Sequence, residues 1–480
     1  MSIPLSDSRS SRSPRTSALP SSRRSFLGLA GALGVAGLSA CATGGASGGS
    51  EQAGPAAATS EDNPFGVDGG EFTAFVFDGG TGVPHLDFTQ DLFATERPEV
   101  TTKIVRAEDL STLQPQFVNQ SPPDLFQNSG AGALDVNSLA TNDQLASLED
   151  LLAAPSWDDP AITVEESLNP GVREAGMVAD QLVGLNTVQY AWAIWHDAAL
   201  FAGKGWEMPR TWDQLMTLSA TIKADGIYPW AFTGMNANYF DEGVFQPLVA
   251  KIGGQEVWKN VDNLEDGAWQ QSAIREAAEA LLQLRTDELI LPGVAQMTHI
   301  QSQTAWLNHE AAFIPVGAWL ENEMKSAIPE GFELTATALP APDESLADLT
   351  PNNPGAGWYV PADAANQPAA FEFLRALLSK DASQNYAKLT NSVTMVKGAH
   401  EGQELSPAFA TITEMIDKSN AVEPWAPVKF DSWYPSMVEE IRAALTALVL
   451  GDLDVDGFLD RCQKKADATK ADDAIAKQTR

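Results

Sequence analysis

Short apolar segments alternate with amphipathic segments from Glu71 onward. The pattern predicts strands at Phe72–Phe77, Val100–Val105 and Asp124–Phe126, with helices at Leu86–Thr95 and Leu110–Val118 between them. This order is typical of a parallel sheet with helices on its faces. Ligands of such folds gather beyond the carboxyl ends of the strands. The loops Asp78–Gly80 and Asn128–Gly132 follow the first and third strands, so both are candidates for ligand contact.

The rest of the chain continues with strands and helices in mixed order. The pattern predicts strands at Tyr190–Trp195, Phe313–Val316 and Trp358–Val360, and helices at Trp212–Ala224, Ala273–Arg285, Gln301–Asn308, Pro368–Ser379, Ser436–Leu450 and Val455–Lys465. The stretch Pro351–Gly357 is rich in Pro, Asn and Gly, which predicts a loop before Trp358. The fold class predicted from these elements is α/β.

The first part of the chain has the features of an export signal. Residues 1–40 hold five Arg and one acid, and the run Phe26–Ala40 carries no charge. Such a run is shorter than the roughly 20 residues that cross a bilayer, so a signal peptide is expected. Ser22–Leu27 resembles a twin-arginine motif and Leu38–Cys41 a bacterial lipobox, in which Cys41 becomes the lipid-modified N-terminus.

The segment after the signal predicts a tether. Residues 41–62 are rich in Gly, Ala and Ser, a composition typical of flexible linkers. Lipidation of Cys41 would hold the mature protein on the outer face of the cell membrane. Cys462, the second of the two cysteines, then has no disulfide partner, and a buried thiol in a helix is expected.

Charge and composition exclude several classes of function. The 480 residues include 30 Lys+Arg and 64 Asp+Glu, for a formal net charge of −34. Nucleic-acid binding needs clustered Lys and Arg, so it is not expected. The five His are scattered singly and no residue pattern matches a metal or nucleotide motif. Neither a metal nor another cofactor is therefore predicted.

Tryptophan is the most informative residue type in the chain. All thirteen Trp lie between Trp157 and Trp433. Several stand beside Gly, Pro or Asn, as at Trp230, Trp319, Trp358, Trp425 and Trp433. A flat aromatic face complements the C–H face of a pyranose, and nearby polar side chains would pair with its hydroxyls. Since Trp is heavily buried on average, we expect about two to four of them to contact a ligand.

Several motifs together resemble the extracellular solute-binding proteins of bacterial ABC sugar importers (family 1). Three segments carry the general resemblance: Pro209–Leu215, Gln303–Leu320 with Gly317-Ala318-Trp319, and Phe371–Ser379. Others resemble the group that binds N-acetylglucosamine and N,N′-diacetylchitobiose in actinomycete importers: Asn63–Val67, Phe77–Gly80, Pro123–Leu125 with Asn128–Asp135, Ala154–Pro160 and Trp319–Met324. The resemblance extends over most of residues 63–465.

The resemblance implies a two-lobed clamp of the periplasmic-binding-protein type (type II). Each lobe would have a central sheet flanked by helices, and hinge strands would join the lobes. We expect lobe 1 to comprise residues 71–187 plus 354–400, and lobe 2 residues 190–350 plus 405–480. The implied activity is reversible capture of a sugar and its delivery to the permease, with no catalysis. A monomer is expected.

The resemblance also implies candidate binding residues. Asp78 and Asn128 lie in the loops that would face the cleft, and Glu321 could accept a hydroxyl hydrogen bond or serve only as an acid favoured at a helix N-terminus. The aromatic and hinge candidates are Gln189, Tyr190, Tyr239, Trp319 and Trp433, of which Trp319 and Trp433 would be sugar platforms.

Two other functions remain open from the residues alone. A binding protein for a different sugar, or for a solute such as a polyamine or phosphate ester, could share the fold. A secreted, lipid-anchored glycoside hydrolase would need a pair of carboxylates around the scissile bond, and spacing does not identify one.

Overall fold

A computed structural model describes residues 58–79, 83–130, 132–178 and 180–480. The predicted signal peptide, Cys41 and the tether up to residue 57 lie outside these ranges. Among the described residues, none of the helices has the length and apolar character needed to cross a membrane.

One mixed sheet runs through the described part of the chain. Its main path has the order β2-β1-β3-β10-β6-β8-β7, and β9 and β11 also pair with β6. The bounds are β1 (Gly70–Phe77), β2 (Val100–Ala107), β3 (Leu125–Gln127), β6 (Leu185–Asp197), β7 (Tyr228–Trp230), β8 (Ala311–Gly317), β9 (Leu334–Thr337), β10 (Asn352–Tyr359) and β11 (Val393–Thr394), with β4 (Met177–Val178) and β5 (Gln181–Leu182) forming a separate pair. β1 pairs in parallel with both β2 and β3, as the sequence pattern predicted.

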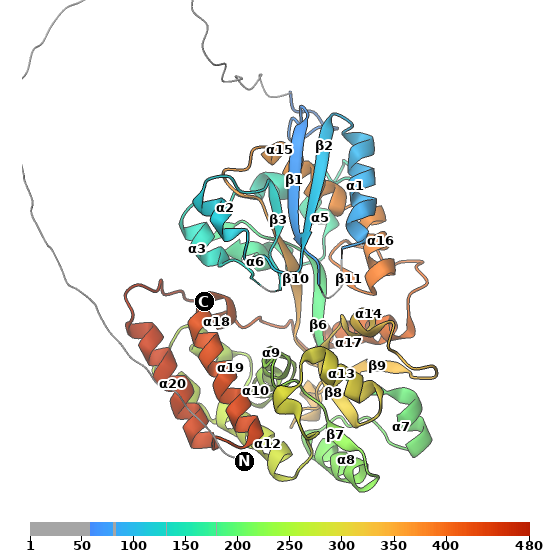
Figure 1. The fold of residues 1–480 in the computed structure, drawn as a ribbon, viewed down its shortest axis with the longest axis vertical. Helices are drawn as coiled ribbons and strands as arrows, with labels where there is room; N and C mark the ends of the chain where they lie inside the picture. The colour runs from blue at the N-terminus through green and yellow to red at the C-terminus, as the bar shows by residue number, and fades with distance from the viewer. Residues whose placement is uncertain (1–57, 80–82, 131, 179) are drawn as a thin grey trace, which may run out of the picture. The chain divides into compact units, whose positions relative to one another are not determined.

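Strand β6 links the two ends of the sheet. Residues 185–191 pair with β10 and residues 192–195 pair with β8, both antiparallel. Figure 1 shows β6 and β10 side by side where the chain passes from the β1–β3 region to the β7–β9 region. Because the same strand belongs to both regions, it is where a hinge between them would have to bend.

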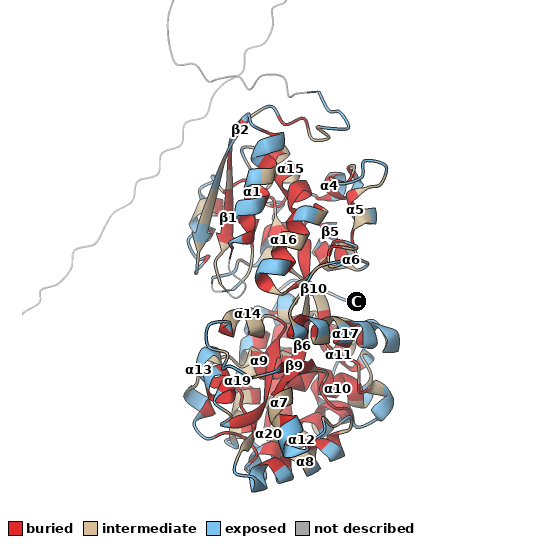
Figure 2. Cartoon of the chain, turned by 90° about the vertical axis from the view of Figure 1, so that its right-hand side faces the viewer, coloured by how far each residue is buried: buried red, intermediate tan, exposed pale blue. Residues whose placement is uncertain are grey.

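Helices cover the faces of the sheet. Their bounds are α1 (His85–Glu96), α2 (Gln114–Val118), α3 (Val136–Thr141), α4 (Glu149–Ala153), α5 (Val164–Ser167), α6 (Val172–Gly176), α7 (Ala198–Lys204), α8 (Trp212–Ala224), α9 (Asn238–Phe240), α10 (Gln246–Gly253), α11 (Glu256–Asp262), α12 (Ser272–Thr286), α13 (His299–Leu307), α14 (Leu320–Met324), α15 (Gln367–Leu377), α16 (Lys380–Thr390), α17 (Pro407–Val422), α18 (Phe430–Trp433), α19 (Pro435–Leu450) and α20 (Val455–Ala471). Figure 2 shows buried residues on one side of α1 and exposed residues on the other.

The buried apolar residues form separate cores. One large cluster draws on residues 191–349 and 408–466. Two others draw on residues 67–185 with 358–399 and on residues 75–183. We call the first the β8 core and the other two together the β1 core. The predicted lobe boundaries stay a prediction, since core membership does not locate where the lobes separate. Cys462 is a free, buried thiol in α20, as expected.

Two predicted elements differ from the structure. Only Gln114–Val118 of the predicted helix Leu110–Val118 is helical. The Asp109 carboxylate accepts a hydrogen bond from the Ser111 backbone N–H (2.7 Å), and this local bond holds a turn in place of the first helical turn.

The stretch predicted as a loop, Pro351–Gly357, instead forms most of β10, from Asn352 onward. It pairs with β6 even though Pro and Gly are poor strand formers. Gly355 is required here because an added Cβ would lie 2.3 Å from Cδ2 of Tyr190. Close packing of an aromatic ring on the backbone therefore accounts for a glycine at position 355 of this strand.

Candidate functional site

Four aromatic side chains converge where β6 meets the end of β8. Tyr190 and Trp192 are two residues apart on β6, so their side chains leave the same face of the strand. Trp192 pairs with Gly317, the last residue of β8. The chain then turns and returns Trp319 toward β6. Tyr239, in α9, completes the group, which we call the aromatic cluster.

Trp319 lies at the centre of this cluster. Its ring meets Trp192 edge to face at 5.0 Å, Tyr190 at 5.7 Å and Tyr239 at 6.1 Å between centroids. Its indole Nε1 donates to the Tyr239 hydroxyl at 3.4 Å. A Cβ on Gly317 would lie 1.9 Å from Cζ3 of Trp319, so glycine is what allows the ring to occupy this position. Edge contacts on several sides fix the ring orientation.

Burial separates the tryptophans into two groups. Ten of the thirteen are buried, including Trp230, Trp358 and Trp425, each of which stands directly after a Pro or Gly. Trp230 ends β7 and Trp358 lies in β10, so these two rings belong to the core. The three half-buried rings are Trp157, Trp319 and Trp433. The Arg375 guanidinium lies 4.8 Å from the Trp157 ring centroid, which gives that ring a structural contact.

Three further candidates, Gln189, Glu321 and Trp433, each contact other residues of the protein. Gln189, beside Tyr190 on β6, donates from Nε2 to Asn352 Oδ1 at 2.9 Å. Glu321 lies in the first turn of α14 and accepts a 2.6 Å bond from Ser406 Oγ. Burial raises the pKa of Glu321, and the Ser406 bond opposes this shift. Both of its suggested roles, hydroxyl acceptor and helix-terminal acid, therefore stay open.

Trp433 ends α18, where its ring centroid is 6.2 Å from that of Tyr434.

Asp78 and Asn128 follow β1 and β3 in the β1 core. The loops that carry them meet on Phe77, because Cβ atoms on Gly79 and Gly130 would lie 2.5 Å and 2.0 Å from its ring. Both polar groups of the Asn128 amide are engaged with the backbone of Leu134, at 2.9 and 2.8 Å. Asn128 therefore shapes its own loop.

Of the predicted site residues, Tyr190 and Tyr239 both contact Trp319, and Gln189 is adjacent to Tyr190 on β6.

Trp192 and His299 were not among the site residues predicted from the sequence. Trp192 was treated as part of a strand, yet its i, i+2 spacing from Tyr190 was a usable signal. The His299 ring stacks on Tyr239 at 5.7 Å with an interplanar angle of 23°. Its Nε2 lies 3.4 Å from Glu323 Oε1. No signal in the sequence links His299 to Tyr239, because the two belong to different helices.

A group of charged residues lies next to the aromatic cluster: Asp241 and Glu242 are on the π-helical turn Asp241–Phe245 that follows α9, Asp431 is in α18 and Arg442 is in α19. Arg442 contacts Asp241 (3.1 Å), Glu242 (2.7 Å) and Asp431 (3.7 Å), so three carboxylates share one guanidinium. Burial, followed by the Asp431 charge, raises the pKa of Asp241 to about 7. Burial also raises the pKa of Glu242 to about 8, although Arg442 opposes the shift. We call these four residues the Arg442 group.

Because of the raised pKa values in the Arg442 group, we expect the free energy of unfolding to fall as the pH rises. Its acids titrate near pH ~4 when unfolded, so between pH ~4 and ~8 the folded state binds more protons than the unfolded state. This contribution is complete below the unfolded pKa and is lost as pH rises through the folded pKa. We expect Glu242→Gln to melt about 3 °C above the wild type at pH 8.5 and at the same temperature at pH 5, by calorimetry. Glu279→Gln, an exposed acid on α12, is the matched control. An equal difference at both pH values would refute the assignment.

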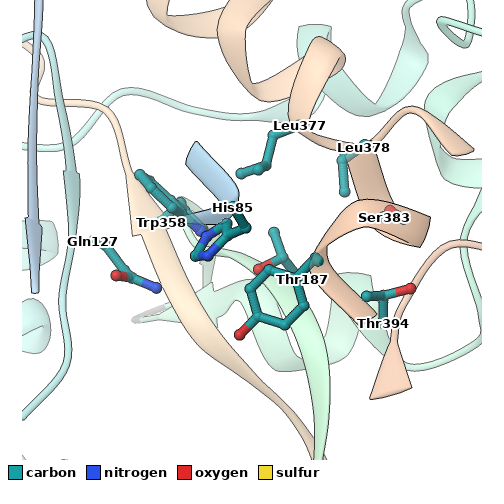
Figure 3. A pocket seen from close by; sticks show the side chains of 9 residues that line it. His85, Gln127, Thr187, Trp358, Leu377, Leu378, Ser383 and Thr394 are labelled. Carbon is teal, nitrogen blue, oxygen red and sulfur yellow. The ribbon is translucent and has the colours of Figure 1, made fainter. Parts of the chain in front are cut away.

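The described part of the structure also contains a small cavity of about 10 Å³ in the β1 core, near β6, with both polar and apolar residues around it. Figure 3 shows His85, Gln127, Thr187 and Thr394 around it. Its volume fits about one water molecule, so it is not a sugar site. Among the described residues, no group of acids, His or Cys is arranged to hold a metal ion.

Comparison with known proteins gives consistent results. Residues 82–384 match the family described as "Bacterial extracellular solute-binding protein". The chain is 29% identical over 435 residues to the diacetylchitobiose binding protein NgcE of Streptomyces coelicolor, covering 88% of this chain and 90% of that one.

Solved structures share the fold at lower identity. A chitin oligosaccharide binding protein aligns with a TM-score of 0.69 at 19% identity, over 85% of this chain and all of its own (100%). Apo RafE from Streptococcus pneumoniae aligns with a TM-score of 0.68 at 16% identity, over 83% and 98% of the two chains. The predicted α/β fold class is thereby confirmed.

Proposed function

Because the chain belongs to the bacterial extracellular solute-binding protein family, we propose that it captures N-acetylglucosamine, N,N′-diacetylchitobiose or a related oligosaccharide and delivers it to the permease of an ABC importer. The choice of sugar is supported by the relative from Streptomyces coelicolor, whose printed name states diacetylchitobiose binding. The motifs at Asn63–Val67 and Trp319–Met324 support the same group.

The half-buried ring of Trp319 is the single observation that carries the proposal. It is locked edge-on by Tyr190, Trp192 and Tyr239. A pyranose would stack on its free area, and burial of the C–H face would drive binding. Trp433 would provide a second platform. Gln189 and Tyr190 would supply polar contacts on the hinge strand, with Asp78 and Asn128 approaching from the β1 core.

The proposed cycle is binding and release without bond cleavage. The sugar favours the closed arrangement of the two lobes, and bending at β6 and β10 absorbs the motion. The lobes would follow the predicted boundaries, 71–187 plus 354–400 and 190–350 plus 405–480. A dissociation constant near 1 μM corresponds to about −8 kcal/mol, which is within reach of two stacked rings and several buried hydrogen bonds.

Hydrolysis is the less favoured alternative, because acids near the aromatic cluster already have partners. Glu323 accepts from Gln303 Nε2 at 2.7 Å, Glu242 from Arg442 Nη2 at 2.7 Å and Glu321 from Ser406 Oγ. A glycosidase needs one carboxyl free to protonate the leaving group and a second free to act on the sugar.

Export and anchoring complete the proposal. The signal in residues 1–40 would direct export, and lipid on Cys41 would hold the protein at the outer face of the membrane, with residues 41–62 as the tether. A single copy would present the sugar to the permease.

Calorimetric titration of the purified protein tests the proposal. The sugars are N-acetylglucosamine, N,N′-diacetylchitobiose, maltose and cellobiose. We expect the first two to bind near micromolar concentration and to remain intact, which chromatography of the recovered sugar would show. Binding of maltose or cellobiose alone would keep the family and refute the N-acetyl preference. Cleaved sugar would favour the hydrolase.

A further inference from the structure

The short helix that carries Trp433 is held by a carboxylate from another element. Asp262 ends α11, and its side chain is fully buried (0% exposed). Its Oδ1 accepts the backbone N–H groups of Lys429 (3.0 Å) and Phe430 (2.7 Å), at the start of α18. A four-residue helix has little stability of its own, so its placement depends on such bonds.

The other oxygen of Asp262 pairs with the last described segment of the chain. Arg480 Nε lies 2.6 Å from Asp262 Oδ2. The Asn263 side chain makes two hydrogen bonds to the Arg480 backbone. The Arg480 N–H donates to Asn263 Oδ1 (2.8 Å), and the Arg480 carbonyl accepts from Asn263 Nδ2 (3.1 Å). The hydrogen bonds between the Arg480 backbone and the Asn263 side chain therefore hold the Arg480 guanidinium beside Asp262.

A second contact from the same segment reaches the residue after Trp433. The Gln478 backbone N–H donates to the Tyr434 hydroxyl at 3.1 Å. The Gln478 side chain lies 3.5 Å from Asn137 Oδ1, and Asn137 Nδ2 donates to the Ser432 carbonyl at 2.6 Å. Tyr434, after Trp433, therefore contacts Gln478 directly, and Ser432, before Trp433, is linked to Gln478 through Asn137.

We propose that Arg480, acting through Asp262, is a positioning residue that orients Trp433 for sugar binding. This inference rests on the proposed function, in which Trp433 is a sugar platform. Arg480 pairs with the carboxylate that caps α18, so it affects the platform without touching sugar. A buried carboxylate without its cation would favour rearrangement of the groups bonded to it, including the start of α18. A ring that is no longer preorganised must be ordered on binding, at a cost in affinity.

The test combines affinity with a signal from Trp433 itself. The full chain is labelled with 5-fluorotryptophan, and the Trp433 resonance is assigned in the ¹⁹F spectrum by its loss in Trp433→Phe. Arg480→Ala, Arg480→Lys and the control Lys470→Ala are compared. Lys470, in α20, pairs with the exposed Asp266 at 2.8 Å. Tyr434→Phe, which removes only the hydroxyl contact with Gln478, is the milder variant should Arg480→Ala fold poorly.

We expect Arg480→Ala to weaken binding of N,N′-diacetylchitobiose about 5- to 10-fold and to shift or broaden the Trp433 resonance. Arg480→Lys should restore part of both effects, Tyr434→Phe should shift the resonance, and Lys470→Ala should change neither. An unmoved Trp433 resonance in Arg480→Ala and Tyr434→Phe would overturn the inference, whatever the affinity. If the wild type binds no sugar, the proposed function fails, while the resonance still reports whether Arg480 positions Trp433.

Discussion

Trp319→Ala is expected to weaken N,N′-diacetylchitobiose binding at least about 100-fold, or about 2.7 kcal/mol. The substitution removes the proposed sugar platform and also the ring that Tyr190, Trp192 and Tyr239 hold in place. Because the ring is half-buried, the loss of stability should be smaller than for a core Trp. Calorimetric titration measures the loss of affinity, and a thermal melt measures the stability.

Two further variants make this expectation specific. Trp157→Ala removes another half-buried ring, one that packs on Arg375, and should leave affinity within about twofold. Gly317→Ala keeps the Trp319 ring but forces it aside, since the new Cβ would lie 1.9 Å from Cζ3. We expect it to weaken binding by about tenfold or more. Unchanged affinity in Trp319→Ala would remove Trp319 from the site.

Glu372→Gln is expected to lower the free energy of unfolding by about 3–5 kcal/mol. Glu372, on α15, is fully buried in the β1 core. It accepts hydrogen bonds from Arg97 (2.5 Å) and from two nitrogens of Arg375 (2.9 and 2.8 Å). The amide would leave two largely buried guanidinium groups without a counter-charge. Urea unfolding, followed by circular dichroism, measures the change.

The matched control is an acid of the same type on the surface. Glu414 pairs with Lys418 at 2.8 Å along α17, and its side chain is 64% exposed. Glu414→Gln should change the unfolding free energy by less than about 0.5 kcal/mol. Equal effects of the two substitutions would contradict the view that burial makes the Glu372 pairs important.

Periodicity predicted the β1–β3 region and most of the helices because those elements form through local patterns. Most of strand β10 was missed because the reason for Gly355, the Tyr190 ring on the neighbouring strand, is visible only in the folded sheet. The same limit applies to the site. Single residues such as Tyr239 and Trp319 stood out as aromatic candidates, but their convergence with Trp192 and His299 depends on pairing of β6 with β8 and on packing between helices. Asn128 was expected in a loop that faces the cleft, and its amide is engaged by the backbone of Leu134.

A crystal structure of the complex with N,N′-diacetylchitobiose would decide whether Trp319 binds the sugar. We expect one pyranose ring stacked on Trp319, with Tyr239 and Tyr190 beside it and Trp433 at the second sugar unit. A sugar bound away from the aromatic cluster, or Trp319 covered by protein with no sugar against it, would contradict the proposed site.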